Sequence, residues 1–291
     1  CRTPSGVSYM LENREIMMKM FPDLFHSNRV LRVDDYPTRL LQTLMSLAPK
    51  KCDSSVPTVV LLTPGHLNSA YYEHTFLSDQ MGIEMVEAQD LFVENDFLYM
   101  KTVDGPKKID VVYRRIDDDY LDPLAYNPNS VIGVPGITHV YKTGGVNICS
   151  APGAGIADDK AVYIYVPEMI KFYLGETPIL DNVQTWRCER DDDLKYVLEN
   201  IDELVIKEVD GSGGHGMLIG PKSTKQEIED FSSKLKLHPE GYIAQPTLDL
   251  SSSPTLIDNE ISGRRVDLRP FCLLGEKVQL CPGGLTRVAL G

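Results

Sequence analysis

The chain has 291 residues, of which 42% are hydrophobic and 24% charged, fractions that are ordinary for a globular protein and disfavour disorder. The sequence contains no apolar run near the roughly 18 residues that a membrane span needs. With 29 Lys and Arg against 42 Asp and Glu, the net charge is −13, which disfavours a nucleic-acid-binding protein. The six cysteines have no C-x-x-C spacing, so we expect reduced thiols and a cytoplasmic location rather than a zinc site or a disulfide framework.

Both ends of the sequence suggest part of a longer protein. The chain starts at Cys1 rather than at an initiator Met, and this start is too polar for a signal peptide. It stops at Gly291, directly after the apolar residues 288–290. We therefore expect an excised fragment whose function depends in part on residues outside it.

The first fifty residues are expected to be mostly helical. A Met- and Glu-rich stretch predicts a helix over 12–20, which the step Phe21–Pro22 interrupts. Pro37 is suited to the first turn of a second helix, in which leucines recur up to Leu47. The pattern therefore predicts two successive helices before the first strand.

Strands and helices alternate between residues 57 and 150. The predicted elements are a buried parallel strand at Thr58–Leu62, a helix over 69–81, and strands over 83–86 and 109–113. The last strand delivers Arg114 and Arg115 at its carboxyl end, where ligands gather in parallel sheets. Both arginines are therefore candidates for binding a substrate carboxylate, and pairing with the acidic residues 117–119 is the alternative.

The remainder of the sequence predicts a second group of elements. These are a helix over 158–174, a strand over 204–208, a glycine-rich turn over 211–216, a strand over 217–219, a helix over 224–237, a strand over 242–245, and a β-meander over 266–290 with turns at 275–276 and 282–284.

The segment around Lys207 carries the strongest chemical signal. A strand delivers this lysine, and four of the seven residues 210–216 are glycine. Glycines let backbone N–H groups approach phosphate oxygens, and the lysine adds a positive charge. A P-loop has its lysine after the glycines, and a Rossmann fingerprint opens a helix, so both are disfavoured here. The alternative is a glycine-rich hairpin with a surface lysine.

A second lysine, Lys160, lies 47 residues before Lys207, with the segment Asn182-Val183-Gln184-Thr185 between them. The order of elements here is that of an ATP-grasp nucleotide-binding lobe. In chain order it has a lysine, a helix, an N-V-x-T segment, a strand with a lysine, a glycine loop, a strand, a helix and a strand. In that order the two lysines converge on the α- and β-phosphates, and the strand that contains Gln245 supplies the adenine edge.

The sequence as a whole resembles the circularly permuted ATP-grasp proteins, a bacterial family of carboxylate–amine ligase-like proteins distantly related to glutathionylspermidine synthase. The resemblance covers essentially all 291 residues. The segments that carry it are Arg2–Tyr9, Glu12–Arg14, Tyr113–Asp119, Ala157–Lys160, Gly211–Gly216, Asp267–Phe271 and Gly283–Leu290. It implies a mixed α/β (α+β) fold: a circularly permuted ATP-grasp nucleotide-binding lobe with an α/β pre-ATP-grasp-like domain.

The resemblance implies a division into three parts. Residues 1–56 would be an N-terminal helical segment of the ATP-grasp core, and residues 57–150 a substrate-side, pre-ATP-grasp-like domain. Residues 151–291 would form the ATP-grasp lobe, with a glycine-loop lid at about 187–250. Within it, the loop 210–216 is expected to order when nucleotide binds, because glycines leave it with high backbone entropy.

The resemblance also implies roles for individual residues. It assigns ATP binding to Lys160, Lys207, Gly211, Ser212, Gly213, Gly214, His215, Gly216 and Gln245. It assigns a catalytic role to Arg287, facing phosphate or the acyl intermediate, where the fork geometry of arginine is suited; pairing with a strand carboxylate is the alternative. Arg2, Thr3 and Ser5 are candidates for the acceptor site, against ordinary turn chemistry around Pro4.

The function implied is ATP-dependent carboxylate–amine (peptide-bond-forming) ligation through an acylphosphate, with ATP and Mg²⁺ as cofactors. The substrates would be a small-molecule or peptide carboxylate and an amine, with no nucleic acid or membrane as partner. The family's metal ligands precede the R-T-P-S-G motif and would fall before Cys1, so we assign none and expect this fragment to bind ATP weakly without turnover. A small-molecule kinase or phosphotransferase on the same scaffold, or a non-catalytic nucleotide-binding scaffold protein, is the alternative.

Overall fold

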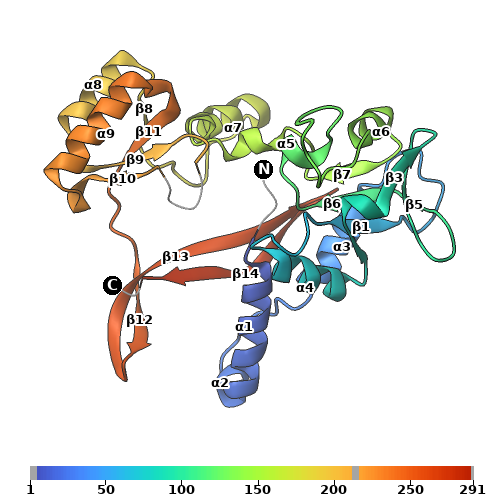
Figure 1. Ribbon diagram of the computed structural model, residues 1–291. Coiled ribbons are helices and arrows are strands. Elements are labelled where there is room, and N and C mark those ends of the chain that lie inside the picture. Colours follow the sequence, from blue (N-terminus) through green and yellow to red (C-terminus); the bar gives the residue numbers. More distant parts are fainter. Residues whose placement is uncertain (1–4, 212–215, 290–291) are drawn as a thin grey trace. The chain divides into compact units, whose positions relative to one another are not determined.

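The computed structural model describes residues 5–211 and 216–289 (Figure 1). The chain divides into two compact units. The smaller unit is Ala154–Leu250, and the larger unit combines the described residues up to Gly153 with those from Ser251 onward. Within these described ranges, no helix is long and apolar enough to cross a membrane.

The larger unit mixes helices and sheets, as the sequence predicts. Its helices are α1 (Val7–Met20), α2 (Pro22–Ser27), α3 (Tyr36–Ser46), α4 (Tyr71–Met81), α5 (Asp118–Leu121) and α6 (Ile137–Thr143), with a 3-10 turn η1 (Ala88–Asp90). Its strands are β1 (Val59–Leu62), β2 (Glu84–Val86), β3 (Leu91–Glu94), β4 (Phe97–Met100), β5 (Lys107–Ile109), β6 (Val111–Arg114), β7 (Asn147–Cys149), β12 (Ser252–Ile257), β13 (Glu260–Leu274) and β14 (Val278–Val288). The helices predicted over 12–20, from Pro37 and over 69–81 are confirmed as α1, α3 and α4.

A parallel sheet in the order β2-β1-β6-β7 forms the core of the larger unit. Every residue of β1 is buried, and alternate side chains enter two apolar clusters. Leu61 shares a cluster with Leu44 of α3 and Leu77 of α4, whereas Leu62 shares the other with Ile137 of α6. Figure 1 shows α4 and α6 on opposite sides of this sheet. A strand that is covered on both faces needs a continuous apolar run, which explains the predicted buried strand.

The predicted strand over 109–113 is in fact two strands of different sheets. β5 ends at Ile109 and pairs with β4 in the antiparallel sheet β3-β4-β5, whereas β6 begins at Val111 and pairs with β1. Asp110 separates the two strands, and its buried carboxylate accepts a hydrogen bond from the backbone N–H of Thr58 at 2.9 Å. This long-range contact, rather than local sequence preference, ends one strand and starts the next.

The last strands of the larger unit form an antiparallel sheet in the order β12-β13-β14. The predicted turn at Gly275–Glu276 is confirmed, since it lies between β13 and β14. The predicted turn at 282–284 is wrong, because β14 continues through these residues with an irregularity in its pairing to β13. A Cβ atom on Gly283 would lie 2.7 Å from a methyl group of Val33, so this glycine permits close packing rather than a turn.

A buried acidic residue holds the start of α1. One carboxylate oxygen of Glu73, on α4, accepts hydrogen bonds from the backbone N–H groups of Gly6 at 2.7 Å and Ser8 at 3.2 Å. The other oxygen pairs with the guanidinium of Arg115 at 2.8 Å, and both side chains are 4% exposed. Gly6 has a φ of 100° and no side chain to cap the helix. Glu73 therefore supplies, from another helix, the acceptor that an N-cap residue normally provides.

His74, beside Glu73 in the sequence, is expected to make the stability of the larger unit depend on pH. Its side chain is buried, and its Nδ1 is hydrogen-bonded to Thr63 Oγ1 at 2.8 Å. Burial first, and the positive charge of Arg115 second, lower the pKa of His74 to about 4. As the pH falls below about 6.5, the unfolded chain takes up this proton before the folded one, so the free energy of unfolding should decrease down to about pH 4.

Urea unfolding at pH 7 and pH 5 tests this pH dependence in the wild type and in His74→Asn, which has no titrating ring. Between these two pH values the wild type should lose about 2 kcal/mol more unfolding free energy than the variant. Protonation of the carboxylates contributes equally to the loss in both proteins, so it cancels in the difference between them. Equal losses in the two proteins would contradict the assignment of this effect to His74.

The smaller unit contains an antiparallel sheet in the order β10-β9-β11-β8. Its strands are β8 (Trp186–Arg187), β9 (Leu204–Glu208), β10 (Leu218–Ile219) and β11 (Tyr242–Pro246). Its helices and turns are η2 (Ala154–Asp158), η3 (Val162–Tyr165), α7 (Val166–Leu174), α8 (Asp191–Glu199), η4 (Gly220–Lys222), α9 (Lys225–Leu237) and η5 (Pro239–Gly241). The predicted strands over 204–208 and 242–245 and the helix over 224–237 are confirmed as β9, β11 and α9.

The predicted helix over 158–174 is α-helical only in its second half. Two 3-10 turns, η2 and η3, come first, and α7 follows with Pro167 in its first turn. Asp159 caps a short turn, since its carboxylate accepts hydrogen bonds from the backbone N–H groups of Ala161 at 2.7 Å and Val162 at 3.2 Å. No residue of α7 is buried.

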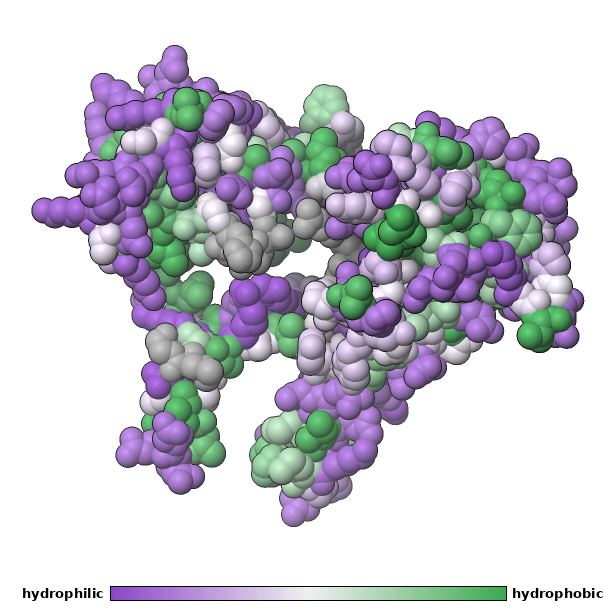
Figure 2. Space-filling model, viewed as in Figure 1, coloured by the Kyte–Doolittle hydropathy of each residue, from purple (hydrophilic) through white to green (hydrophobic). Residues whose placement is uncertain are grey.

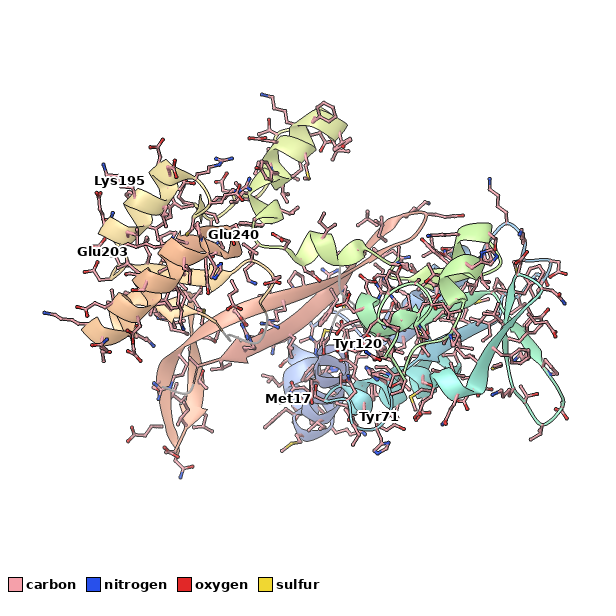
Figure 3. The ribbon with its side chains drawn as sticks, turned by 45° about the horizontal axis from the view of Figure 1, so that its top comes forward. Met17, Tyr71, Tyr120, Lys195, Glu203 and Glu240 are labelled. Carbon is pink, nitrogen blue, oxygen red and sulfur yellow. The ribbon has the colours of Figure 1, made fainter. Side chains whose placement is uncertain are left out.

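Helices α8 and α9 cover one face of the sheet in the smaller unit. Ile206 of β9 is paired with Ala244 of β11, and both are buried in a cluster with Val197 of α8 and Leu235 of α9. Figure 2 shows hydrophilic residues over the outer surface of these two helices. In Figure 3, Lys195 projects from α8 away from the sheet. The opposite face of the sheet is therefore the one that carries the polar side chains of β9 and β11.

Candidate functional site

Lys207 lies on the sheet face opposite to α8 and α9. Side chains alternate along a strand, and the preceding residue, Ile206, is buried toward the helices. The register pairs Lys207 with Ile243 and Val205 with Gln245, which makes Lys207 and Gln245 diagonal neighbours on one face. The Lys207 ammonium donates a hydrogen bond to Gln245 Oε1 at 2.8 Å. Strand register thus explains why these two predicted site residues meet.

Lys160 reaches the same neighbourhood from the segment between η2 and η3. Its backbone N–H donates to the carbonyl of Val209 at 2.9 Å, and its ammonium donates to the carbonyl of Gly211 at 2.6 Å. Val209 directly follows β9, so the ammonium lies at the start of the glycine-rich loop. The charge of Lys160 is near enough to contribute to a lowered pKa of Lys207. The structure therefore brings together two lysines that are 47 residues apart in the sequence.

Uncharged oxygens hold both ammonium groups. The acceptor of Lys207 is a side-chain amide and that of Lys160 is a backbone carbonyl; among the described residues neither lysine forms an ion pair. Burial first, and the charge of Lys160 second, lower the pKa of Lys207. Two cations that are close together and partly removed from water are stabilised by an anion. The arrangement is therefore suited to binding phosphate oxygens.

The glycine-rich loop is described at its two ends. Gly211 accepts the hydrogen bond from Lys160, and Gly216 has a φ of 65°. A Cβ atom on Gly216 would lie 2.1 Å from the carboxyl carbon of Glu208, so the chain returns to β10 in close contact with the end of β9. Four residues predicted to bind ATP lie outside the described residues: Ser212, Gly213, Gly214 and His215. The lid that these residues would form stays a prediction.

Arg287 lies on β14 of the larger unit and is paired with a carboxylate of the neighbouring strand. Its Nε donates to Asp267 Oδ2 at 2.8 Å, and its backbone N–H donates to Asp267 Oδ1 at 3.1 Å. Arg269 is 3.8 Å from the same carboxylate, and the hydrogen bond from Arg287 is the main cause of the lowered pKa of Asp267. The pairing that we weighed as the alternative is present, and the catalytic role of Arg287 stays a prediction.

Arg114 ends β6 and Arg115 follows it; their side chains are 8% and 4% exposed, and each is held by the protein. Arg114 donates to the carbonyl of Ser150 at 2.6 Å and pairs with Asp118 at 2.7 Å, one of the acidic residues that we considered as partners. Arg115 pairs instead with Glu73, which no local pattern in the sequence indicates. These contacts give both arginines a structural role, and carboxylate binding by them stays a prediction.

Of the three residues predicted to line the acceptor site, Ser5 is described and is exposed. It directly precedes Gly6, whose N–H is held by Glu73. Arg2 and Thr3 lie outside the described residues. The position of Ser5 therefore depends on the buried contacts at the start of α1.

The described residues offer no ready metal site. No group of three or more His, Cys, Asp or Glu side chains in the described ranges could hold a metal ion. The cysteines that the structure describes are free thiols. A cavity of about 620 Å³ lies in the larger unit but contains none of the predicted site residues; its lining is Leu11, Arg14, Glu15, Met18, Phe25, Val30, Leu31, Arg32, Val33, Asp34, Phe76 and Gln80.

The sequence predicted both lysines and Gln245 as site residues but not the contacts that fix them. Gln245 Nε2 donates to the hydroxyl of Thr185 at 2.9 Å, just before β8. The backbone N–H of Val183 donates to the hydroxyl of Tyr163 at 2.9 Å. The N-V-x-T segment was the available signal, because its position between the two lysines marks it as part of the lobe.

The sequence of the chain matches a known family. The sequence profile of the circularly permuted ATP-grasp type 2 family matches residues 1–289. The uncharacterized protein sll0335 of Synechocystis sp. is 51% identical over 99% of this chain, and an uncharacterized protein of Mycobacterium tuberculosis is 50% identical over 99%. The chain spans 60% and 52% of the length of these two relatives.

More distant matches extend the comparison. A protein of Frankia casuarinae, named provisionally as a glutamate–cysteine ligase, is 37% identical over 99% of this chain, which spans 33% of its length. Among solved structures, a glutathione synthetase-like effector from Globodera pallida has a TM-score of 0.55 and 12% identity, over 88% of this chain and 58% of its own, and it supports the fold alone. The chain thus belongs to the circularly permuted ATP-grasp type 2 family.

Proposed function

We propose that the protein is an ATP-dependent carboxylate–amine ligase with a nucleotide site formed by Lys160, Lys207 and Gln245. The observation that carries the proposal is a pair of ammonium groups hydrogen-bonded to uncharged oxygens, that of Lys160 at the start of the glycine-rich loop and that of Lys207 beside Gln245. Membership of the ATP-grasp family and the ligase name of the Frankia relative support this choice.

The proposed roles follow from the contacts of each side chain. Lys160 and Lys207 would each keep the present acceptor and bind phosphate oxygens with the remaining donors of the ammonium group, because hydrogen bonds between charged groups are the stronger ones. Gln245 would lie at the base end, because it is two residues along β11 from the position opposite Lys207. ATP, when bound, supplies the phosphoryl group that activates a carboxylate for attack by an amine. In such a reaction the protein contributes positioning and charge stabilisation.

The described residues do not fit Mg²⁺, because they contain no cluster of three or more potential ligands. Phosphoryl transfer by related chemistry normally uses a metal that bridges phosphate oxygens. We therefore assign no metal ligand within the described ranges and no catalytic step to a metal. The substrate role proposed for Ser5 and the catalytic role of Arg287 rest on the family resemblance. The substrate roles of Arg114 and Arg115 rest on their place at the carboxyl end of a parallel strand.

An ADP-release screen of the full-length protein tests the proposal. Amino acids, short peptides and polyamines are supplied singly and in carboxylate–amine pairs, and products are identified by mass spectrometry. A ligase should release ADP only when both a carboxylate and an amine are present, and the product should be an amide. ADP release with a single substrate that becomes phosphorylated would show a kinase instead, and ATP binding without turnover would show a non-catalytic scaffold.

A further inference from the structure

The segment Asn182–Thr185 connects the surroundings of both lysines, although the proposed function gives it no role. At one end, the Asn182 amide donates to the carbonyl of Tyr163 at 2.8 Å, and the N–H of Val183 donates to the Tyr163 hydroxyl at 2.9 Å. Tyr163 belongs to the turn η3 that follows Lys160. At the other end of the segment, the hydroxyl of Thr185 accepts from the Gln245 amide at 2.9 Å. One short segment therefore contacts the elements that hold each lysine.

The hydrogen bonds at Thr185 give the Gln245 amide one orientation. Lysine can only donate hydrogen bonds, so the Gln245 atom that faces Lys207 must be the amide oxygen. The Lys207 ammonium is 2.8 Å from this oxygen. The amide nitrogen then faces Thr185, whose own hydroxyl proton is donated to the carbonyl of Val183 at 2.9 Å. The contacts of the amide oxygen and of the amide nitrogen require the same orientation. Lys207 therefore donates to Gln245, Gln245 donates to Thr185, and Thr185 donates to a backbone carbonyl.

Strand register places Thr185 where this contact requires it. β8 pairs with β11 so that Trp186 lies opposite Ala244. Thr185 precedes Trp186 and Gln245 follows Ala244, so in this antiparallel pair Thr185 lies opposite Gln245. The two side chains therefore share a sheet face with Lys207. The hydroxyl thus belongs to the same polar row as the lysine. Removing it would leave a partly buried amide nitrogen without its acceptor.

We propose that Thr185 is a positioning residue for nucleotide binding, which holds the Gln245 amide so that its oxygen directs the Lys207 ammonium into the site. The proposal rests on the proposed function, because it assumes that Lys207 binds a nucleotide. Thr185 acts through Gln245 and does not itself touch the ligand. Without the hydroxyl, Gln245 can adopt other rotamers and Lys207 loses its fixed position.

Calorimetry with ATP on the full-length protein tests this role through three variants. Thr185→Val removes the hydroxyl at nearly constant volume, and Thr185→Ser retains it. Thr247→Val is the matched control, because the Thr247 hydroxyl is in the same unit but donates to the carbonyl of Glu203 at 2.9 Å. We expect Thr185→Val to weaken ATP binding roughly three- to tenfold, with Thr185→Ser near the wild type and Thr247→Val unchanged.

The ¹⁵N-labelled side-chain amide of Gln245 provides a second readout that a general loss of stability would not reproduce. Its two proton resonances should be separated from the free-amide position in the wild type and in Thr185→Ser, and should move to that position in Thr185→Val. If the wild type binds ATP and Thr185→Val binds it equally well, the inference is overturned while the proposed function stands. Failure of the wild type to bind ATP would instead overturn the proposed function and the inference together.

Discussion

Glu73→Ala is expected to lower the free energy of unfolding of the larger unit by about 3–5 kcal/mol. The substitution leaves the buried guanidinium of Arg115 without the carboxylate that it meets at 2.8 Å. It also removes the acceptor of the backbone N–H groups of Gly6 and Ser8 at the start of α1. One change therefore removes the carboxylate that pairs with a buried charge and accepts from two helix-start donors.

The control for this substitution is Asp35→Ala, which removes the same charge from an exposed ion pair. Asp35 is 2.6 Å from Arg39, but the side chains are 45% and 39% exposed, so the expected loss is about 0–1 kcal/mol. Trp186 is the single tryptophan and belongs to the smaller unit, so its fluorescence reports that unit separately from circular dichroism of the whole protein. A loss for Glu73→Ala no larger than that for Asp35→Ala would show that the buried pair is not the main anchor.

Lys207→Met is expected to weaken binding of ATP to the full-length protein by roughly 10- to 100-fold. Methionine preserves much of the length of the side chain but removes the charge, and hydrogen bonds to charged groups contribute about 1.5–3 kcal/mol. The remaining contact of Lys160 with Gly211 should preserve part of the binding. The affinity is measured by calorimetry at two salt concentrations, and the variant should show the weaker salt dependence.

Lys195→Met is the matched control for this measurement. Lys195 is exposed on α8, on the side of the sheet opposite to Lys207, and Figure 3 shows it projecting away from the sheet. The two variants change the net charge of the protein equally. A difference between their affinities for ATP is therefore due to the contacts of Lys207 and not to the change in net charge. Equal affinities for ATP in the two variants would contradict the placement of Lys207 in the nucleotide site.

Local patterns in the sequence predicted the elements whose geometry depends on near neighbours. The apolar run at Thr58–Leu62 and the strand predicted over 204–208 correspond to β1 and β9. The sheet β3-β4-β5 is missing from the sequence prediction, although Asn95 and Asp96 have φ values of 51° and 62°, as expected for a two-residue hairpin turn. The sequence contains the corresponding signal, two consecutive residues of types that tolerate a positive φ, and it was overlooked.

Other features depend on contacts between distant residues, which no local pattern contains. The break at Asp110 follows from a hydrogen bond to Thr58, 52 positions away. The glycines at 283–284 predicted a turn, yet one of them permits contact with Val33 instead. For the site, the order of elements predicted that the two lysines belong together, but the sheet register was needed to show that Gln245 and Thr185 are their neighbours.

The long-range cap of α1 has a consequence for the order of folding. The first turn of α1 is closed by an acceptor that lies 67 positions from Gly6 and 65 positions from Ser8. Gly6 provides no local substitute, so this turn gains its hydrogen bonds only after the intervening chain has closed a long loop and α4 has docked. Contacts at such large sequence separation slow folding and form late. The start of α1, with Ser5 just before it, is therefore expected to be among the last parts of the larger unit to become ordered.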